Sequence, residues 1–91
     1  MGDAAVRRRM MKRSGVIAIP TKGFDGDYRK CKFTVTCFDE PDTRGLDGGK
    51  IDYMAITMDG ELIAEHSGGW LLEPTCREAE IAASILIYEL N

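Results

Sequence analysis

The clearest pattern in the chain is the alternation of apolar and polar residues between positions 28 and 38. The even positions from 30 to 36 hold Lys and Thr, and the odd positions are apolar: Cys31, Phe33, Val35 and Cys37. A period of two is typical of a β-strand that buries one face and exposes the other. We therefore predict a half-buried strand over residues 28–38, with both cysteines as small core residues.

Three further β-prone runs follow or precede this strand. Residues 50–58 carry apolar side chains at both parities, which indicates either a central strand or a strand with a β-bulge. Asp59-Gly60 favours a two-residue type I′ hairpin, so the returning strand is predicted over residues 61–66. A shorter run at residues 16–19 ends at Pro20.

A single helix is predicted at the end of the chain. Thr75 is a suitable N-cap, and Glu78 three residues later completes a capping box. The helix should run from about residue 76 to residue 90. Its apolar surface is wide, which indicates that it lies on a sheet. These apolar residues are Ile81, Ala82, Ile85, Leu86 and Ile87.

Together these elements predict an α+β fold: an antiparallel sheet of three or four strands with one C-terminal helix packed on one face. Trp70 follows Gly68-Gly69 and is expected to close the junction between sheet and helix. The predicted core consists of Phe33, Val35, Cys37, Ile51, Ile56, Met58, Ile63, Trp70, Leu72, Ile81, Ile85 and Leu86.

The length of 91 residues corresponds to one domain. Residues 1–14 are predicted to be a basic flexible tail, because Arg7–Arg13 has no clean apolar period, and residues 15–91 the single domain. No apolar run approaches the ~20 residues needed to cross a bilayer, and none after the basic start suits a secretory signal. A cytoplasmic location without membrane contact is the expectation.

Candidate chemistry is sparse. His66 is the only histidine and has no evident partner for acid–base or nucleophilic catalysis. The three cysteines lack the close pairs of structural zinc sites and are expected to be free thiols. Gly45–Lys50 resembles a phosphate loop only superficially, and the acidic loop before it lacks calcium-loop spacing. We therefore expect no enzyme activity, no metal and no cofactor.

Charge is divided along the chain. Residues 1–38 hold nine of the twelve Lys/Arg and three of the fifteen Asp/Glu, a formal +6, so residues 39–91 carry −9 and the sum is −3. Such asymmetry points to a charged partner or a basic arm. Two candidate binding segments follow from it. The acidic loop comprises Asp39, Glu40, Asp42 and Asp47, and the basic tail comprises Arg7, Arg8, Arg9, Lys12 and Arg13.

Each segment has two interpretations. The acidic loop is either a solvated rim or a surface that imitates nucleic-acid phosphates and binds a basic groove. The basic tail either contacts nucleic-acid phosphates in a salt-dependent, sequence-independent manner or has no binding role. It contains no aromatic residue for stacking on bases.

Several spaced features are similar to those of a small family of uncharacterised proteins common in phages and integrative elements. They are Gly26, the strand at residues 33–39, the segment 45–51, Asp59-Gly60, and Gly69-Trp70 before Glu73-Pro74 and the closing helix. The resemblance covers about residues 23–90. It implies a phage or mobile-element accessory protein acting in the host cytoplasm, where small proteins of this kind often block host defence machinery.

Two functions are therefore expected, and an enzyme is the least favoured class. The first is a non-enzymatic accessory protein that binds a host protein, such as a nucleic-acid-binding defence effector, and inhibits it as anti-CRISPR proteins do. The alternative is a small nucleic-acid or nucleotide-binding module that uses the basic N-terminal half.

Overall fold

The computed structural model describes residues 10–21 and 26–91. They form a five-stranded antiparallel sheet with a short 3-10 helix and one α-helix, so the fold is α+β as predicted. The strands follow one another across the sheet in sequence order, as a meander. The elements are β1 (Met10–Pro20), β2 (Tyr28–Phe38), η1 (Leu46–Gly48), β3 (Ile51–Met58), β4 (Glu61–Ser67), β5 (Trp70–Leu72) and α2 (Arg77–Leu90).

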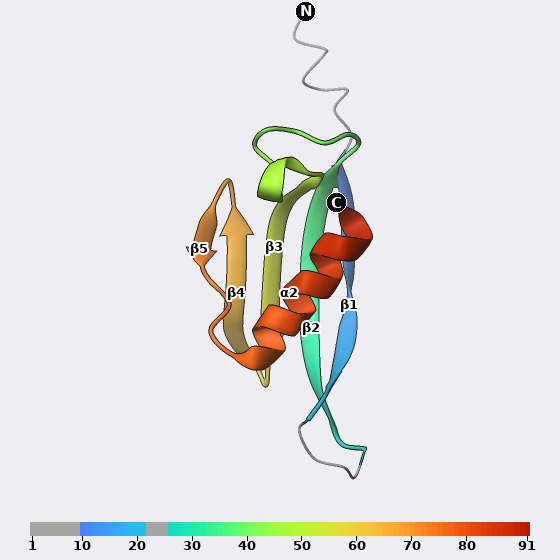
Figure 1. Ribbon diagram of the computed structural model, residues 1–91, viewed down its shortest axis with the longest axis vertical. Helices are drawn as coiled ribbons and strands as arrows, with labels where there is room; N and C mark the ends of the chain where they lie inside the picture. Colours follow the sequence, from blue (N-terminus) through green and yellow to red (C-terminus); the bar gives the residue numbers. More distant parts are fainter. Residues whose placement is uncertain (1–9, 22–25) are drawn as a thin grey trace, which may run out of the picture.

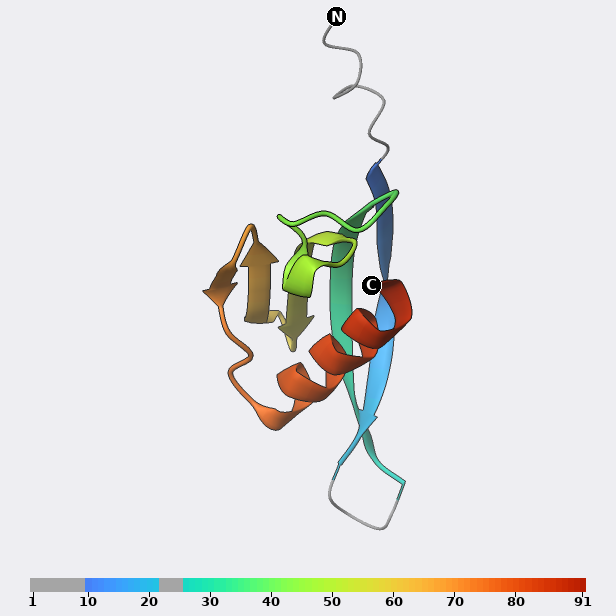
Figure 2. The same ribbon diagram turned by 45° about the horizontal axis from the view of Figure 1, so that its top comes forward.

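The helix α2 covers one face of the sheet. It crosses diagonally from the lower end of β4 to the upper part of β1, and Figures 1 and 2 both place it on the same side. No element among the described residues covers the opposite face, which we call the uncovered face. No helix in the described part of the chain is long and apolar enough to span a membrane.

The alternation in β2 decides which side chains face the helix. Cys31, Val35 and Cys37 are buried, as predicted, whereas Lys30 and Lys32 are exposed. Antiparallel partners share a face, so the register extends this division to β1 and β3. The buried apolar cluster comprises Ile19, Cys31, Val35, Cys37, Leu46, Ile51, Met54, Ile56, Ile63, Ala64, Ala79, Ala82, Ala83 and Leu86.

The first strand is longer than predicted. β1 begins at Met10 and pairs with β2 from Met10↔Phe38 to Pro20↔Tyr28 without a register shift. Residues 10–14, predicted as part of the tail, are therefore strand. The charges of Lys12 and Arg13 break the apolar pattern, so the sequence did not indicate a strand here. A strand at the edge of a sheet nevertheless tolerates such long charged side chains. Residues 1–9 lie outside the described residues.

The hairpin predicted at Asp59-Gly60 is confirmed. Both residues have positive φ, 55° and 80°, as a type I′ turn requires, and they join β3 to β4. The register shifts between Thr36 and Cys37 and again between Ile56 and Thr57. β3 is thus central in the sheet and has a bulge in its pairing with each neighbour. Each bulge changes which alternate residues face the helix, and this explains the apolar residues at both parities.

The prediction of three or four strands missed β5. This strand has only three residues and pairs with β4 through His66↔Trp70 and Glu65↔Leu72. Trp70 was placed in the core by the sequence, but 36% of it is exposed on this edge strand. A three-residue strand carries no usable periodicity, so only its pairing with β4 reveals it.

The helix begins differently from the prediction. Its N-cap is Cys76, whose side chain makes no capping hydrogen bond, and the Thr75 amide instead donates to the Ile63 carbonyl at 3.0 Å. The expected capping box is therefore wrong, because Thr75 is held by the bulged part of β4. Ile85, predicted in the core, is 39% exposed, and the small residues Ala79, Ala82 and Ala83 let the helix approach the sheet closely.

Candidate nucleic-acid interface

The uncovered face carries three lysines on its two longest strands. Lys12 pairs with Thr36, Val16 with Lys32, and Ala18 with Lys30, so all of these side chains share one face. This face is opposite the one that holds Cys31 and Val35, and all three lysines are exposed. The β1–β2 hairpin therefore presents a basic surface that α2 cannot shield.

Two of these lysines line a shallow hollow of about 420 Å³. Its other lining residues are Val16 on β1, Thr57 on β3 and the Asp59-Gly60 turn. Lys32 and Thr57 are cross-strand partners, which brings an ammonium and a hydroxyl together at the middle of the sheet. Asp59 forms an ion pair with Arg29 at 2.9 Å at the rim, which compensates its negative charge.

Tyrosine and threonine side chains complete the uncovered face. Tyr28 pairs with Pro20, lies on the same face as Lys30 and is 59% exposed. Tyr53 pairs with Thr36, and its hydroxyl donates a hydrogen bond to Glu65 Oε2 at 3.0 Å. Burial, together with this hydrogen bond to a carboxylate, raises the pKa of Tyr53. Both Tyr53 and the carboxylate are thus fixed in place.

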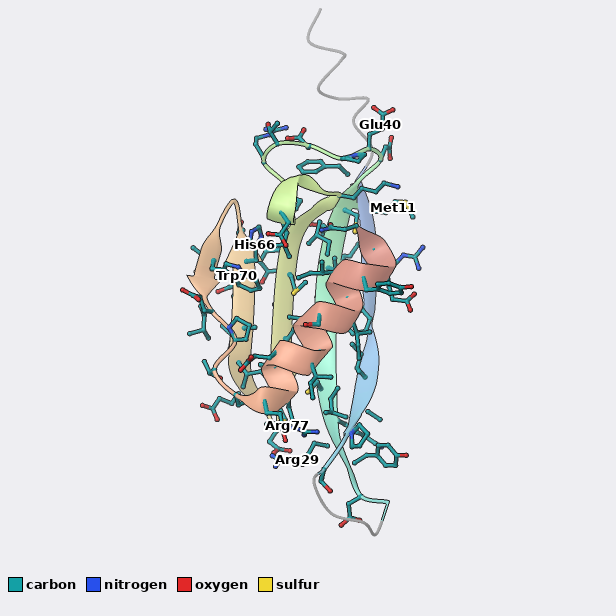
Figure 3. The ribbon with its side chains drawn as sticks, in the orientation of Figure 1. Met11, Arg29, Glu40, His66, Trp70 and Arg77 are labelled. Carbon is teal, nitrogen blue, oxygen red and sulfur yellow. The ribbon has the colours of Figure 1, made fainter. Side chains whose placement is uncertain are left out.

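The two layers of the fold differ in charge. α2 contains Glu78, Glu80 and Glu89 but only one basic residue, Arg77, whereas the uncovered face of β1 and β2 bears the three lysines. Arg77 is turned towards the lower end of the sheet, where its Nη1 donates to the Pro20 carbonyl at 3.0 Å (Figure 3). The charge asymmetry of the sequence therefore becomes, in part, an asymmetry between opposite faces.

The structure separates the residues of the predicted basic tail. Arg7, Arg8 and Arg9 lie outside the described residues. Lys12 is on the uncovered face, whereas Arg13 pairs with Val35 on the helix side and lines a groove beside α2. Lys30 and Lys32 were not assigned to a site by the sequence, although their shared parity with Thr34 already placed them on the polar face of β2.

The acidic loop exposes three of its four carboxylates. Asp39, Glu40 and Asp47 are exposed, and Figure 3 shows Glu40 at the top of the molecule. Asp42 is different, because its side chain is only 15% exposed. It accepts hydrogen bonds from the Arg44 amide at 2.8 Å and from Arg44 Nε at 3.1 Å. Asp42 therefore shapes the loop itself.

This loop is also anchored to the helix terminus. Asn91 Oδ1 accepts hydrogen bonds from the amides of Lys50 and Ile51 at 3.0 and 3.1 Å, and Asn91 Nδ2 donates to the Leu46 carbonyl at 2.9 Å. Leu46 is buried in the core. A Cβ atom at Gly49 would lie 2.3 Å from the Asn91 side chain, so glycine permits this close approach. These contacts tie the end of the acidic loop to the helix and to the core.

His66 lies one residue before the end of β4, where the sequence placed it, and its side chain is buried on the helix side of the sheet. Its ring meets Trp70 edge-on, with centroids 5.2 Å apart, and Nδ1 has no hydrogen-bond partner. Figure 3 shows the two side chains together. Within the described residues, no group of three or more His, Cys, Asp or Glu residues converges on a metal position. The three cysteines are free thiols, as predicted.

Residues 11–91 match the profile of a family described as a domain of unknown function, DUF7678, and the chain belongs to this family. The match begins well before the residue 23 expected from the sequence, because β1 is part of the domain. Membership of a family of unknown function is thus confirmed, whereas a phage or mobile-element origin stays a prediction. No curated protein and no solved structure matches the chain.

Proposed function

We propose that this DUF7678 domain is a non-enzymatic binding module that holds single-stranded nucleic acid on its uncovered sheet face. The observation that carries the proposal is the row of exposed lysines, Lys12, Lys30 and Lys32, on the face opposite the helix. The proposal keeps the basic N-terminal half expected from the sequence but moves the contact from the tail to the sheet.

The chemistry of this face suits a nucleic-acid backbone. Lysine ammonium groups neutralise phosphates regardless of base sequence and release condensed counterions. Thr57 adds a hydroxyl to the hollow between Lys30 and Lys32. The exposed ring of Tyr28 beside Lys30 offers a stacking surface for a base. The expected binding mode is therefore electrostatic with little sequence preference.

The shape of the face favours a single strand over a duplex. A duplex groove admits a helix or a two-stranded ribbon, whereas this face is the open side of a five-stranded sheet. An unpaired strand can follow the surface and turn its bases towards an aromatic ring.

The test is fluorescence anisotropy with a labelled single-stranded oligonucleotide over a range of salt concentrations. Lys30→Gln combined with Lys32→Gln removes two phosphate contacts without a change in the helix side of the sheet. The logarithmic salt slope should fall by about 0.7 for each lost contact, and affinity should drop about tenfold or more at low salt. Lys50→Gln is the matched control, because Lys50 lies beside Asp39 and away from the hollow.

The outcomes are distinct. Weaker binding with a reduced slope for the Lys30/Lys32 variant, and unchanged binding for Lys50→Gln, supports the proposal. Equal loss per removed charge in the two variants means that net charge alone attracts the oligonucleotide. Tighter binding to duplex than to single strands would overturn the choice of ligand.

A basic protein partner at the acidic loop is the second candidate. It is favoured by the exposure of Asp39, Glu40 and Asp47 on a loop whose far end is hydrogen-bonded to Asn91. Such a partner is the class expected for an inhibitor of a nucleic-acid-binding host defence effector, and that host role rests on the sequence alone.

Charge reversal separates the two candidates. Asp39→Lys with Glu40→Lys should slow association with a basic protein and lower its salt dependence, because rim charges act mainly on the association rate. The same variant should bind an oligonucleotide at least as tightly as the parent. Asp42 is left intact because it holds Arg44.

A further inference from the structure

The two edges of the sheet are unequal. β5, at one edge, has three residues, whereas β1, at the other, has eleven and pairs with β2 along its whole length. β1 ends the strand order, and in Figure 1 no other strand lies beside its outer edge, although the last turns of α2 pass over it in this view. An edge of this length presents a row of backbone groups to any strand that can pair with it.

The register shows which backbone groups these are. The Thr21 amide donates to the Asp27 carbonyl at 3.0 Å, in the same register that pairs Pro20 with Tyr28. Hydrogen-bonded and non-hydrogen-bonded residue pairs alternate along an antiparallel ladder. The odd-numbered residues of β1, which share the parity of Thr21, therefore form backbone hydrogen bonds with β2. The even-numbered residues point outwards, and those with an amide proton are Met10, Lys12, Ser14, Val16 and Ala18. Pro20 has the same parity, which fits a residue without an amide proton.

The usual protections of an edge strand are missing from the middle of β1. Natural edges are blunted by bulges, prolines, charges or short length. Residues 14–19 contain no charge and no proline, and β1 has no register shift against β2. Exposed apolar side chains flank this stretch on both faces. On the uncovered face, Val16 is 54% exposed. On the helix side, Met11 is 48% exposed and Ile85 is 39% exposed.

We propose that this edge is covered by a second copy of the chain, with the two β1 strands antiparallel about a two-fold axis at Gly15. This register gives the longest overlap, since Gly15 is the midpoint of residues 10–20. Ser14 then exchanges both backbone hydrogen bonds with Val16 of the second copy, and Lys12 does so with its Ala18. The outward amide groups of Lys12, Ser14, Val16 and Ala18 are thereby satisfied in each chain.

Side-chain chemistry fits a second copy. Opposite residues share a face, so Lys12 faces Ala18 and Arg13 faces Ile17, and no cation faces a cation. Met11, half-exposed in one chain, faces Ile19 of the other. The two Val16 side chains become diagonal neighbours on the uncovered face. The apolar residues beside the edge are thereby covered without a buried charge.

If the uncovered face binds nucleic acid as proposed above, the pairing of two copies enlarges that binding surface. A two-fold axis perpendicular to the sheet places both uncovered faces on the same side and both α2 helices on the other. Lys12, Lys30 and Lys32 of the two chains then form one basic surface over a ten-stranded sheet. A longer nucleic-acid strand would contact both copies.

Sedimentation equilibrium over a wide concentration range, without nucleic acid, tests the pairing directly. The parent chain of 10.1 kDa should approach twice that mass as concentration rises. Ser14→Pro removes an outward amide and leaves the β1–β2 ladder intact, so its dimer dissociation constant should rise about tenfold or more. Ser14→Ala keeps the amide and is the matched control. Thermal melts of both variants establish that each monomer folds.

The results decide between the alternatives. A parent that remains at 10.1 kDa at every concentration overturns the dimer, whatever oligonucleotide binding shows. Equal dissociation constants for Ser14→Pro and Ser14→Ala place the contact elsewhere than the β1 edge and also overturn it. Failure of the proposed function is a separate result: the parent dimerises normally, and Lys30→Gln with Lys32→Gln leaves anisotropy unchanged.

Discussion

Among single residues, the two thiols of β2 are strongly affected by their surroundings. Burial is the main reason that the pKa of Cys31 and the pKa of Cys37 are raised from the ordinary value of 9.0. A raised pKa lowers the thiolate fraction near neutral pH, and the thiolate is the reactive form. Cys76 is half-buried at the start of α2 and more accessible.

We expect the cysteines to react with a thiol reagent in two phases. Cys76 should be modified first, and Cys31 and Cys37 only as the protein opens, because both are buried and protonated. Time-resolved mass spectrometry of the native protein measures the order. Cys76→Ser should abolish the fast phase alone. A fast phase at Cys31 would contradict the burial.

Trp70→Ala should destabilise the fold less than loss of a core aromatic. The ring is 36% exposed and makes an edge contact with His66 at 5.2 Å between centroids. We expect a cost of roughly 1–3 kcal/mol, below the ~3–5 kcal/mol of a fully buried tryptophan. Denaturant unfolding measures it. Leu71→Ala, on the same strand but 65% exposed, should stay within about 0.5 kcal/mol of the parent.

At the scale of elements, the contact between the end of α2 and the 46–51 segment orders the acidic loop. The Asn91 side chain makes three hydrogen bonds there, and the Asn91 amide continues the helix ladder to the Ile87 carbonyl at 3.1 Å. One side chain therefore joins helix, 3-10 turn and the start of β3.

Asn91→Ala should cost about 2–3 kcal/mol, because two amides and a carbonyl lose their partner together. Asn91→Asp keeps the acceptor for Lys50 and Ile51 but sets a carboxylate oxygen against the Leu46 carbonyl, so it should also be less stable than the parent while its Lys50 and Ile51 amides stay protected. Denaturant unfolding of the three proteins gives the order. Hydrogen exchange at Lys50 and Ile51 should rise most in Asn91→Ala.

The start of β1 is where the sequence-based prediction and the structure differ most: the strand begins at Met10, and residues 10–14 were predicted to be part of a tail. A chain that begins at Gly15 lacks the five β1 residues that pair with residues 34–38 of β2. It should melt well below a chain that begins at Met10, because half of the ladder and the cover over Val35 are lost. Equal melting temperatures would restore the interpretation of residues 10–14 as a tail.

At the scale of the whole molecule, stability should decline in alkaline solution. The pKa values of Cys31, Cys37 and Tyr53 are all raised in the folded chain. Above pH 9.0 the unfolded chain loses thiol protons that the folded chain retains, so unfolding becomes more favourable as pH rises. Below that pH both states hold these protons and stability is unaffected by them.

Melting temperatures between pH 8 and pH 10.5 measure this effect, with the midpoint expected to fall steadily above about pH 9. Cys37→Ala should flatten the decline, since it removes one of the groups whose pKa is raised. A midpoint independent of pH in the parent would show that these groups titrate alike in both states.

Local chemistry determined much of the fold. The alternation in residues 28–38 identified β2 and its buried face, because a strand has a period of two and one face lies against the helix. Asp59-Gly60 determined the hairpin, because both residues accept positive φ. The apolar surface of residues 81–87 predicted a helix that covers a sheet, and the α+β class follows from these three features.

Tertiary structure decided what depends on neighbours far along the chain. β1 and β5 exist because β2 and β4 supply their hydrogen-bond partners, and neither carries a clear pattern of its own. The candidate site likewise depends on tertiary structure. Lys12, Lys30 and Lys32 form one surface only through the β1–β2 register, while Asp42 became an internal contact of its loop. Periodicity tells which face of a strand is buried; pairing across the sheet decides which residues share that face.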